Sequence, residues 1–211
     1  MNRGEKLYRI GISGGTFDPI HHGHLIVAEE IRETLGLDKI IFIPTGSPPH
    51  KKEIAVTDSK HRYNMVCEAI RTNEFFEASR IEIERAGYTY TIDTLKQLKT
   101  VFGDGVQLFF ITGADVIHEL LTWKEYESVF SMCEFVAVLR PGYKKDDIVR
   151  EVDHLSARYN ARIHMVDAPL IGISSTFIRE CVKNERSIKY LVPEDVERYI
   201  YQNGLYRRLE A

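Results

Sequence analysis

One stretch constrains this chain more than any other. It spans residues 14–24, with the sequence GGTFDPIHHGH, and an apolar run at residues 7–12 predicts a buried parallel strand before it. Residues 25–35 follow with apolar side chains at helical spacing, which predicts an amphipathic helix. A glycine-rich turn between a strand and a helix N-terminus can bind an anion through backbone N–H groups and the helix dipole. The sequence therefore predicts a phosphate site that the imidazoles of His21 and His24 face.

The remainder of the chain alternates short apolar runs with helical patterns. Strands are predicted at residues 39–44, 76–84, 106–111, 134–139 and 162–166. Helices are predicted from Asp58 or Ser59 to about residue 71, and at 92–102, 116–121 and 146–159. This alternation predicts an α/β fold, a Rossmann-like doubly wound parallel sheet.

Two further helices are expected near the end of the chain, one from Ser174 or Ser175 to about residue 183 and one at 194–202. We therefore expect a single domain over residues 1–211. Its Rossmann-like core would occupy about residues 1–166, and a small C-terminal helical segment would occupy about 167–211.

Charge and cysteine content narrow the class of partners. A formal net charge of −3 argues against a general nucleic-acid surface. Cys67, Cys133 and Cys181 are widely spaced, which favours reduced thiols over a zinc site. No long apolar segment follows the N-terminus, so we expect no signal peptide and no membrane span. The expectation is a cytoplasmic protein without nucleic-acid or membrane partners, and a homo-oligomer is left open.

A second candidate anion site lies far along the chain. Residues 173–179 read ISSTFIR, so the hydroxyls of Ser174 and Ser175 precede a predicted helix, and Arg179 lies one turn inside it. An ordinary capped helix with a surface arginine would explain the same residues. Helix starts share one edge of a doubly wound sheet, so this segment and residues 14–24 could hold one nucleoside triphosphate. Neither a P-loop string nor a Gly-x-Gly-x-x-Gly fingerprint is present.

Three other segments contain residues that could bind a ligand, but each also has a purely structural explanation. The loop at 45–57 contains Lys51 at the ligand-facing edge of the predicted sheet, where it could meet phosphates or simply be solvated. Thr91 is expected to cap the helix at 92–102, and capping alone would explain the hydroxyls around it. Asp115 follows a glycine turn at a strand end, and for Trp123 a core role competes with a stacking role.

Taken together, four motifs resemble the nucleotidylyltransferase superfamily and, within it, the bacterial nicotinate-nucleotide adenylyltransferase family. They are GGTFDPIHHGH at 14–24, YTIDTL at 90–95, GAD with WK within 113–124, and ISSTFIR at 173–179. The first and last mark the superfamily, and the middle two point to the nicotinate branch. The resemblance extends along the whole chain.

This resemblance implies a reaction in NAD biosynthesis. Nicotinate mononucleotide and ATP would give deamido-NAD and pyrophosphate, through in-line attack of the 5′-phosphate on the α-phosphorus. An anion attacks a polyanion, so the protein's tasks are alignment and charge neutralisation, without a covalent protein nucleophile. Mg²⁺ would be bound through the ATP phosphates rather than by protein ligands.

The resemblance also implies roles for particular residues. Catalytic roles are expected for His21, His24 and Arg179. The residues expected to bind ATP and its phosphates are Gly14, Gly15, Thr16, Phe17, Lys51, Ser174, Ser175 and Thr176. The residues expected to bind the nicotinate nucleotide are Tyr90, Thr91, Asp115, Trp123 and Lys124.

On the nicotinate side, Trp123 would stack on the pyridine ring, the Tyr90–Thr91 segment would meet the carboxylate, and Asp115 would bind near the ribose. Lys124 departs from several relatives, which carry an aromatic residue there. It could pair with the nicotinate carboxylate or point to solvent.

Three alternatives to this function remain open at this stage. Another nucleotidylyltransferase, using nicotinamide mononucleotide, phosphopantetheine or CTP, is the nearest. A nucleotide-binding sensor without catalysis is disfavoured by the presence of both histidines and Arg179. A fragment of a class I aminoacyl-tRNA synthetase is disfavoured by the short chain and the lack of a basic face.

Overall fold

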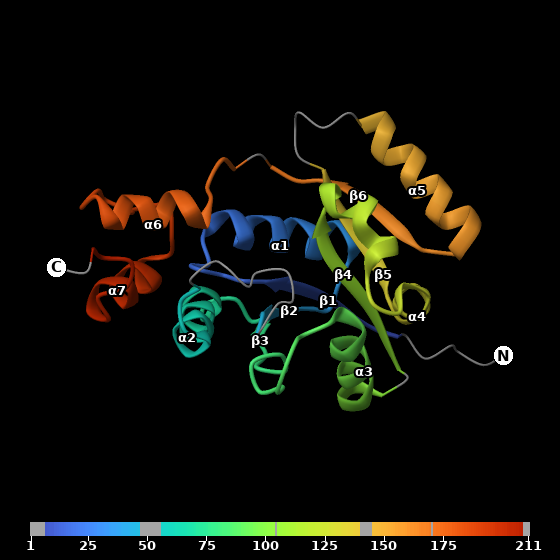
Figure 1. The fold of residues 1–211 in the computed structure, drawn as a ribbon, viewed down its shortest axis with the longest axis horizontal. Helices are drawn as coiled ribbons and strands as arrows, with labels where there is room; N and C mark the ends of the chain where they lie inside the picture. The colour runs from blue at the N-terminus through green and yellow to red at the C-terminus, as the bar shows by residue number, and fades with distance from the viewer. Residues whose placement is uncertain (1–6, 47–55, 104, 140–144, 170, 209–211) are drawn as a thin grey trace.

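Six parallel strands form one sheet in the order β3-β2-β1-β4-β5-β6 (Figure 1). The computed structural model describes residues 7–46, 56–103, 105–139, 145–169 and 171–208. The strands are β1 (Tyr8–Gly15), β2 (Lys39–Pro44), β3 (Phe76–Ala78), β4 (Val106–Gly113), β5 (Glu134–Leu139) and β6 (Ile163–Asp167). The predicted doubly wound parallel sheet is confirmed.

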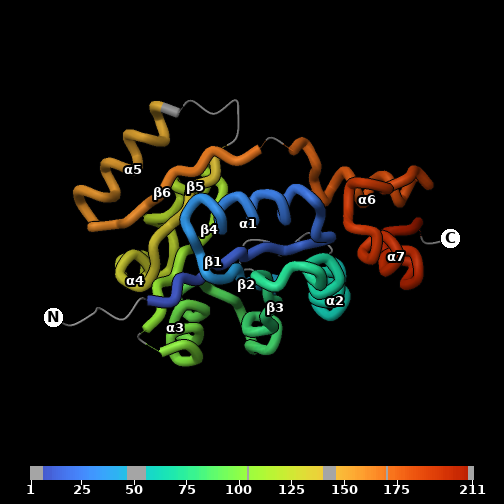
Figure 2. The backbone as a smooth tube through the Cα atoms, turned by 180° about the vertical axis from the view of Figure 1, so that it is seen from behind, coloured from blue at the N-terminus to red at the C-terminus, as the bar shows by residue number. Residues whose placement is uncertain are grey.

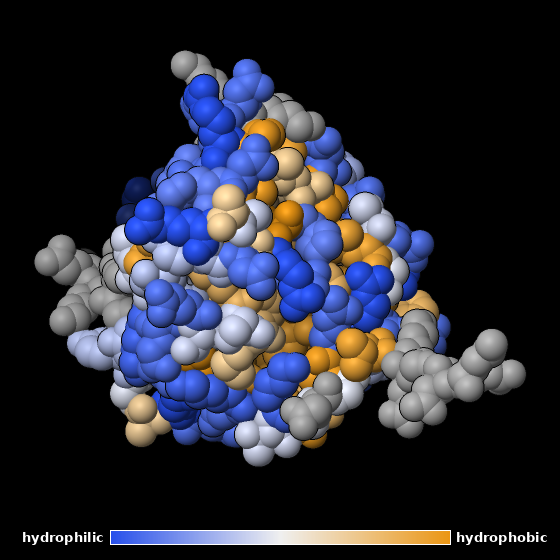
Figure 3. Space-filling view, turned by 90° about the vertical axis from the view of Figure 1, so that its right-hand side faces the viewer, coloured by the Kyte–Doolittle hydropathy of each residue, from blue (hydrophilic) through white to orange (hydrophobic). Residues whose placement is uncertain are grey.

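Helices cover both faces of this sheet (Figures 1 and 2). Against one face pack α3 (Thr91–Phe102), the 3₁₀ helix η1 (Ala114–Thr122), α4 (Tyr126–Met132) and α5 (Lys145–Tyr159). Against the other pack α1 (His22–Leu35), α2 (Ser59–Ile70), α6 (Ser175–Lys183) and α7 (Glu194–Gln202). The side of the molecule that carries α5 is hydrophilic over much of its area, with apolar residues between (Figure 3).

Strand β2 shows why the sequence folds this way. Ile41 and Ile43 point into one apolar layer and Ile40 and Phe42 into the other, and all four are buried. A parallel strand with helices on both faces requires such a continuous apolar run rather than an alternating pattern.

Several element boundaries differ from the sequence predictions. The strand predicted at 76–84 ends at Ala78, and the chain then turns so that the Glu82 carboxylate accepts a hydrogen bond from the Thr94 hydroxyl at 2.8 Å. Helix α1 begins at His22, before the predicted start at residue 25. Residue Tyr90, not Thr91, is the N-cap of α3. The predicted helix at 116–121 is the longer 3₁₀ helix η1, and α4 was not predicted.

Helices α6 and α7 lie together at one end of the molecule, at the left of Figure 1. Ile178 of α6 and Val196 and Ile200 of α7 are fully buried. They belong to the same apolar layer as Phe42 and Met65, so the C-terminal segment packs on the core of the sheet. The two predicted C-terminal helices are therefore present, and they complete one face of the fold.

Candidate active site

The glycine-rich turn lies at the carboxyl edge of the sheet, where the strand order reverses. Strand β1 runs through Gly14 and Gly15 and pairs with β2 on one side and β4 on the other. Consecutive connections leave these central strands in opposite directions, which creates the crevice where open α/β sheets bind ligands. Gly14 is exposed there, and β4 ends at Gly113 beside it.

The imidazoles of His21 and His24 stack at the end of this turn. Their ring centroids are 3.7 Å apart and their planes differ by 25°. His21 is the N-cap of α1, and its backbone N–H donates to Nδ1 of His24 at 3.2 Å. Because Nδ1 accepts this bond, a neutral His24 carries its proton on Nε2, which makes Nε2 a donor. A Cβ at Gly23 would lie 3.0 Å from the His21 ring, so a side chain at this position would require that ring to shift.

The N-terminus of α6 contacts this turn directly. Ser175 Oγ donates to the carbonyl of Pro19 at 2.8 Å. Arg179 Nη1 donates to the carbonyl of Asp18 at 2.7 Å, and its Nη2 lies 3.2 Å from Thr176 Oγ1. Ser174 is the N-cap and accepts from the backbone N–H of Phe177. Two predicted phosphate-binding segments from opposite ends of the chain thus form one continuous surface.

The end of the chain is attached to the same turn. Asp18 is 5% exposed, and its Oδ1 accepts a hydrogen bond from the Tyr206 hydroxyl at 2.7 Å. Its Oδ2 accepts from the backbone N–H of Thr57 at 3.2 Å. Burial raises the pKa of Tyr206, and the neighbouring Asp18 carboxylate raises this pKa further. Nothing in the sequence around Tyr206 indicates a partner 188 residues away.

A buried arginine below the turn was also missed by sequence reasoning. Arg62 on α2 is 2% exposed, and its guanidinium donates to the carbonyls of Thr16, Thr45 and Thr57, each at 2.8 Å. Burial lowers the pKa of Arg62, while the charge of Asp18 acts in the opposite direction. The only signal in the sequence was an arginine among the apolar positions of a predicted helix.

Some of the residues predicted to bind the nicotinate nucleotide lie close to one another. Lys124 Nζ lies 4.6 Å from the ring centroid of Tyr90 and 3.5 Å from Asp93 Oδ2. Asp93 was not among the predicted site residues, although it lies within the YTIDTL motif. Its carboxylate partly neutralises the lysine that the sequence offered as a carboxylate partner.

Other predicted residues have less specific surroundings. Trp123 packs edge-on against Phe110 and Phe135, with ring centroids 5.6 and 6.0 Å apart, and is half-buried. Its core role is therefore visible, while stacking on a ligand stays a prediction. Asp115 is exposed in the first turn of η1. Lys51 lies outside the described residues.

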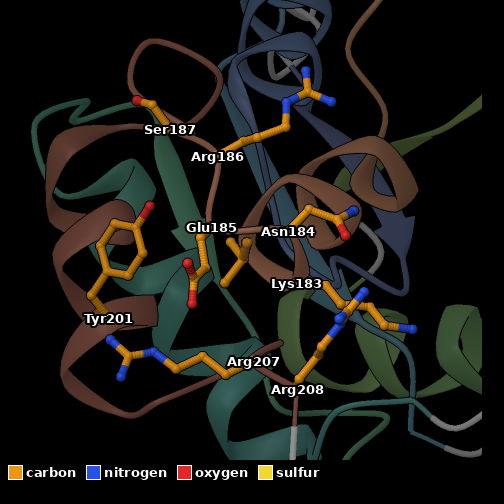
Figure 4. Close-up of a pocket in the computed structure, with 9 residues that line it drawn as sticks. Lys183, Asn184, Glu185, Arg186, Ser187, Tyr201, Arg207 and Arg208 are labelled. Atoms are coloured by element: carbon orange, nitrogen blue, oxygen red, sulfur yellow. The ribbon is translucent and has the colours of Figure 1, made fainter.

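A hollow of about 1100 Å³ lies at the opposite end of α6, away from Ser175 (Figure 4). Lys183, Arg186, Arg207 and Arg208 contribute positive charge to its wall. It is formed by residues at and beyond the C-terminal ends of α6 and α7, where cations stabilise the exposed carbonyls. Helix dipoles there oppose anion binding, which favours the other end of α6 for the predicted phosphate site.

Within the described part of the chain, no group of three or more His, Cys, Asp or Glu side chains is arranged to hold a metal ion. No helix in that part is long and apolar enough to cross a bilayer.

The doubly wound parallel sheet, with a glycine turn and paired imidazoles at its crevice, agrees with the resemblance to nucleotidylyltransferases. The Cytidylyltransferase-like family model matches residues 12–181. A protein named "Probable nicotinate-nucleotide adenylyltransferase" from Thermoanaerobacter is 53% identical over 98% of both chains. A protein of the same name from Moorella thermoacetica is 48% identical, over 98% of this chain and 95% of its own. This chain belongs to the nicotinate-nucleotide adenylyltransferase family.

Solved structures share the fold at lower identity. The nicotinic acid mononucleotide adenylyltransferase of Plasmodium falciparum is 23% identical, and its structures cover 94% of this chain and 97% of their own. The TM-score is 0.75 for the complex with NaAD and 0.73 for the complex with APC. This likeness confirms the arrangement of strands and helices around the crevice.

Proposed function

We propose that this protein transfers the adenylyl group of ATP to nicotinate mononucleotide, giving deamido-NAD and pyrophosphate. The observation that carries the proposal is the contact between α6 and the 14–24 turn. Through Ser175 and Arg179 this contact joins the starts of α1 and α6, the two segments that we propose bind phosphate. Family membership supports the choice of substrates, because relatives at 53% and 48% identity carry the name of this activity.

The triphosphate would lie over the turn. Backbone N–H groups of Gly15, Thr16 and Phe17, together with the start of α6, would hold its oxygens. His24 Nε2–H would donate to the phosphates as negative charge moves from the attacking oxygen toward the leaving pyrophosphate. These donors are fixed before reaction by stacking and by the His21 hydrogen bond, so they need little reorganisation when charge develops. No covalent intermediate is needed.

Arg179 has two tasks in this proposal. One guanidinium nitrogen donates a hydrogen bond to the Asp18 carbonyl, and this bond holds α6 against the turn. The other lies beside Thr176, at the helix start where we place the triphosphate. A planar guanidinium suits this division, because its N–H groups point in fixed and different directions.

The mononucleotide would occupy the side of the crevice bounded by α3 and η1. Tyr90, Thr91 and Lys124 would surround the nicotinate carboxylate, Trp123 would offer a ring edge or face to the pyridine, and Asp115 would contact the ribose. Support comes from the closeness of Lys124 to the Tyr90 ring at 4.6 Å. Because Lys124 also contacts Asp93, we assign it a share of the carboxylate recognition rather than all of it.

Mg²⁺ fits this proposal as an ion that arrives with ATP. The acidic side chain within the turn, Asp18, already accepts hydrogen bonds from the Tyr206 hydroxyl and the Thr57 backbone N–H. Triphosphate oxygens and water would therefore supply the ligands, and the ion would neutralise phosphate charge. Cytoplasmic location, the lack of a nucleic-acid partner and any self-association stay predictions of the sequence.

A substrate panel tests the proposal. Purified protein is supplied with ATP or CTP and with nicotinate mononucleotide, nicotinamide mononucleotide or phosphopantetheine, and pyrophosphate release is followed. We expect release with ATP and nicotinate mononucleotide, with a clear preference over the amide. Release only with CTP or phosphopantetheine would assign another transferase. Tight ATP binding without release under any combination would indicate a sensor.

A further inference from the structure

Arg62 joins three separate segments at the carboxyl edge of the sheet. Thr16 follows β1, Thr45 follows β2, and Thr57 precedes α2. The guanidinium donates to one carbonyl from each at 2.8 Å, and Arg62 is only 2% exposed. Thr45 and Thr57 also begin and end the connection that carries Lys51, so both ends of that connection are attached to the turn by one side chain.

The bond to Thr16 has a directional consequence for the next residue. The only cis peptide bond in the described residues is Asp18–Pro19, so the bond between Thr16 and Phe17 is trans. In a trans peptide the C=O and the following N–H point in opposite directions. Arg62 holds the Thr16 carbonyl inward, and the Phe17 N–H must therefore point away from Arg62.

Phe17 is held in the matching conformation. Its φ of +50° lies in the left-handed region, which a non-glycine residue adopts only when its surroundings fix it. Phe17 is 3% exposed, and its ring packs against His24 and Phe42, with centroid distances of 5.1 and 5.9 Å. Among the described residues, no acceptor is recorded for the Phe17 N–H. That N–H is thus available to a ligand at the turn.

We infer that Arg62 is a positioning residue for adenylyl transfer, orienting and polarising the Thr16–Phe17 peptide so that its N–H faces the triphosphate. This inference rests on the proposed function. A cation on the carbonyl side strengthens the N–H as a donor, because hydrogen bonds in a chain polarise one another. The role needs a guanidinium, since an ammonium group cannot offer the same rigid fork to three carbonyls.

The kinetic test compares Arg62→Lys with a matched control. Arg9→Lys alters a partly buried arginine whose guanidinium also donates to a backbone carbonyl, that of Leu35 at 2.6 Å, at the opposite edge of the sheet. We expect Arg62→Lys to lower kcat per folded molecule by about 10²-fold with little change in KM for ATP, as for loss of a preorganised donor. Arg9→Lys should keep kcat within about twofold. Equal kcat in the two variants, with similar losses of stability, would mean that Arg62 only holds the fold together.

A binding measurement separates this inference from the proposed function. The backbone ¹⁵N–H resonance of Phe17 is followed while pyrophosphate is added to the wild type, which requires no acceptor substrate and no turnover. We expect a saturable shift of this resonance, reduced in Arg62→Lys and retained in Arg9→Lys. An unmoved Phe17 amide in the wild type overturns the inference even if Arg62→Lys fails to fold. A wild type that shows the shift but releases no pyrophosphate with any substrate pair would instead reject the proposed function.

Discussion

Replacing Tyr206 with Phe should measure how much its hydrogen bond to Asp18, in the turn at residues 14–24, stabilises the fold. The change removes one hydroxyl and keeps the ring. That hydroxyl donates to Asp18 Oδ1 at 2.7 Å, and the aspartate is 5% exposed. Hydrogen bonds to charged groups contribute about 1.5–3 kcal/mol, so we expect the free energy of unfolding to fall by about 2 kcal/mol. For a chain of this size that loss corresponds to a Tm lower by about 4–8 °C.

The assay is urea unfolding of the wild type and of Tyr206→Phe, with Tyr190→Phe as the control. Tyr190 is 82% exposed, and its hydroxyl should contribute nothing measurable. A loss below about 0.5 kcal/mol for Tyr206→Phe, or a loss equal to that of Tyr190→Phe, would show that the Tyr206–Asp18 hydrogen bond does not stabilise the fold, because surface substitutions already fall within that range.

The difference in unfolding free energy between the wild type and Tyr206→Phe should also depend on pH. The folded pKa of Tyr206 is raised above that of an unfolded tyrosine, near 10. The unfolded chain therefore loses this proton first as the pH rises, and the stabilisation is fully present below about pH 10 and declines above it. The stability difference between wild type and Tyr206→Phe should be constant from about pH 6 to 9 and shrink above 10. A difference that grows above pH 10 would contradict this sign.

Three further substitutions test the site. His24→Ala should lower kcat by about 10²-fold or more with the fold intact by circular dichroism, because a donor aligned by stacking is lost; unchanged turnover would remove His24 from the mechanism. Ser174→Ala should cost about 1 kcal/mol in urea unfolding, because the cap of α6 is lost. It should also raise KM for ATP, and an unaltered KM would place Ser174 outside the phosphate site. Lys124→Ala should narrow the preference for nicotinate over nicotinamide mononucleotide in kcat/KM, and an unaltered preference would rule this lysine out.

The sequence predicted best what short-range patterns determine. The apolar run of β2 and the glycine turn at 14–24 each encode their structure within a few residues, so the sheet and its crevice could be predicted. The proximity of the α6 start to that turn could also be predicted, because helix starts share one edge in this topology.

Boundaries and long-range bonds were harder to predict. Glu82 alternates with apolar neighbours like a strand residue, yet its bond to Thr94 on α3 holds it in a turn. The attachment of Tyr206 to Asp18 joins positions with no local relation, and it depends on how α7 packs. Arg62 was missed for a related reason. Its partners are backbone carbonyls, which every residue carries, so no residue type in the sequence identifies them.

The most direct test of adenylyl transfer follows the label from [α-³²P]ATP in the presence of nicotinate mononucleotide. We predict that the label appears in a dinucleotide with the mass of deamido-NAD, and that one unlabelled pyrophosphate is released for each dinucleotide formed. Label that appears in AMP or ADP, or that stays in ATP while the mononucleotide is bound, would contradict adenylyl transfer at the turn that joins β1 to α1.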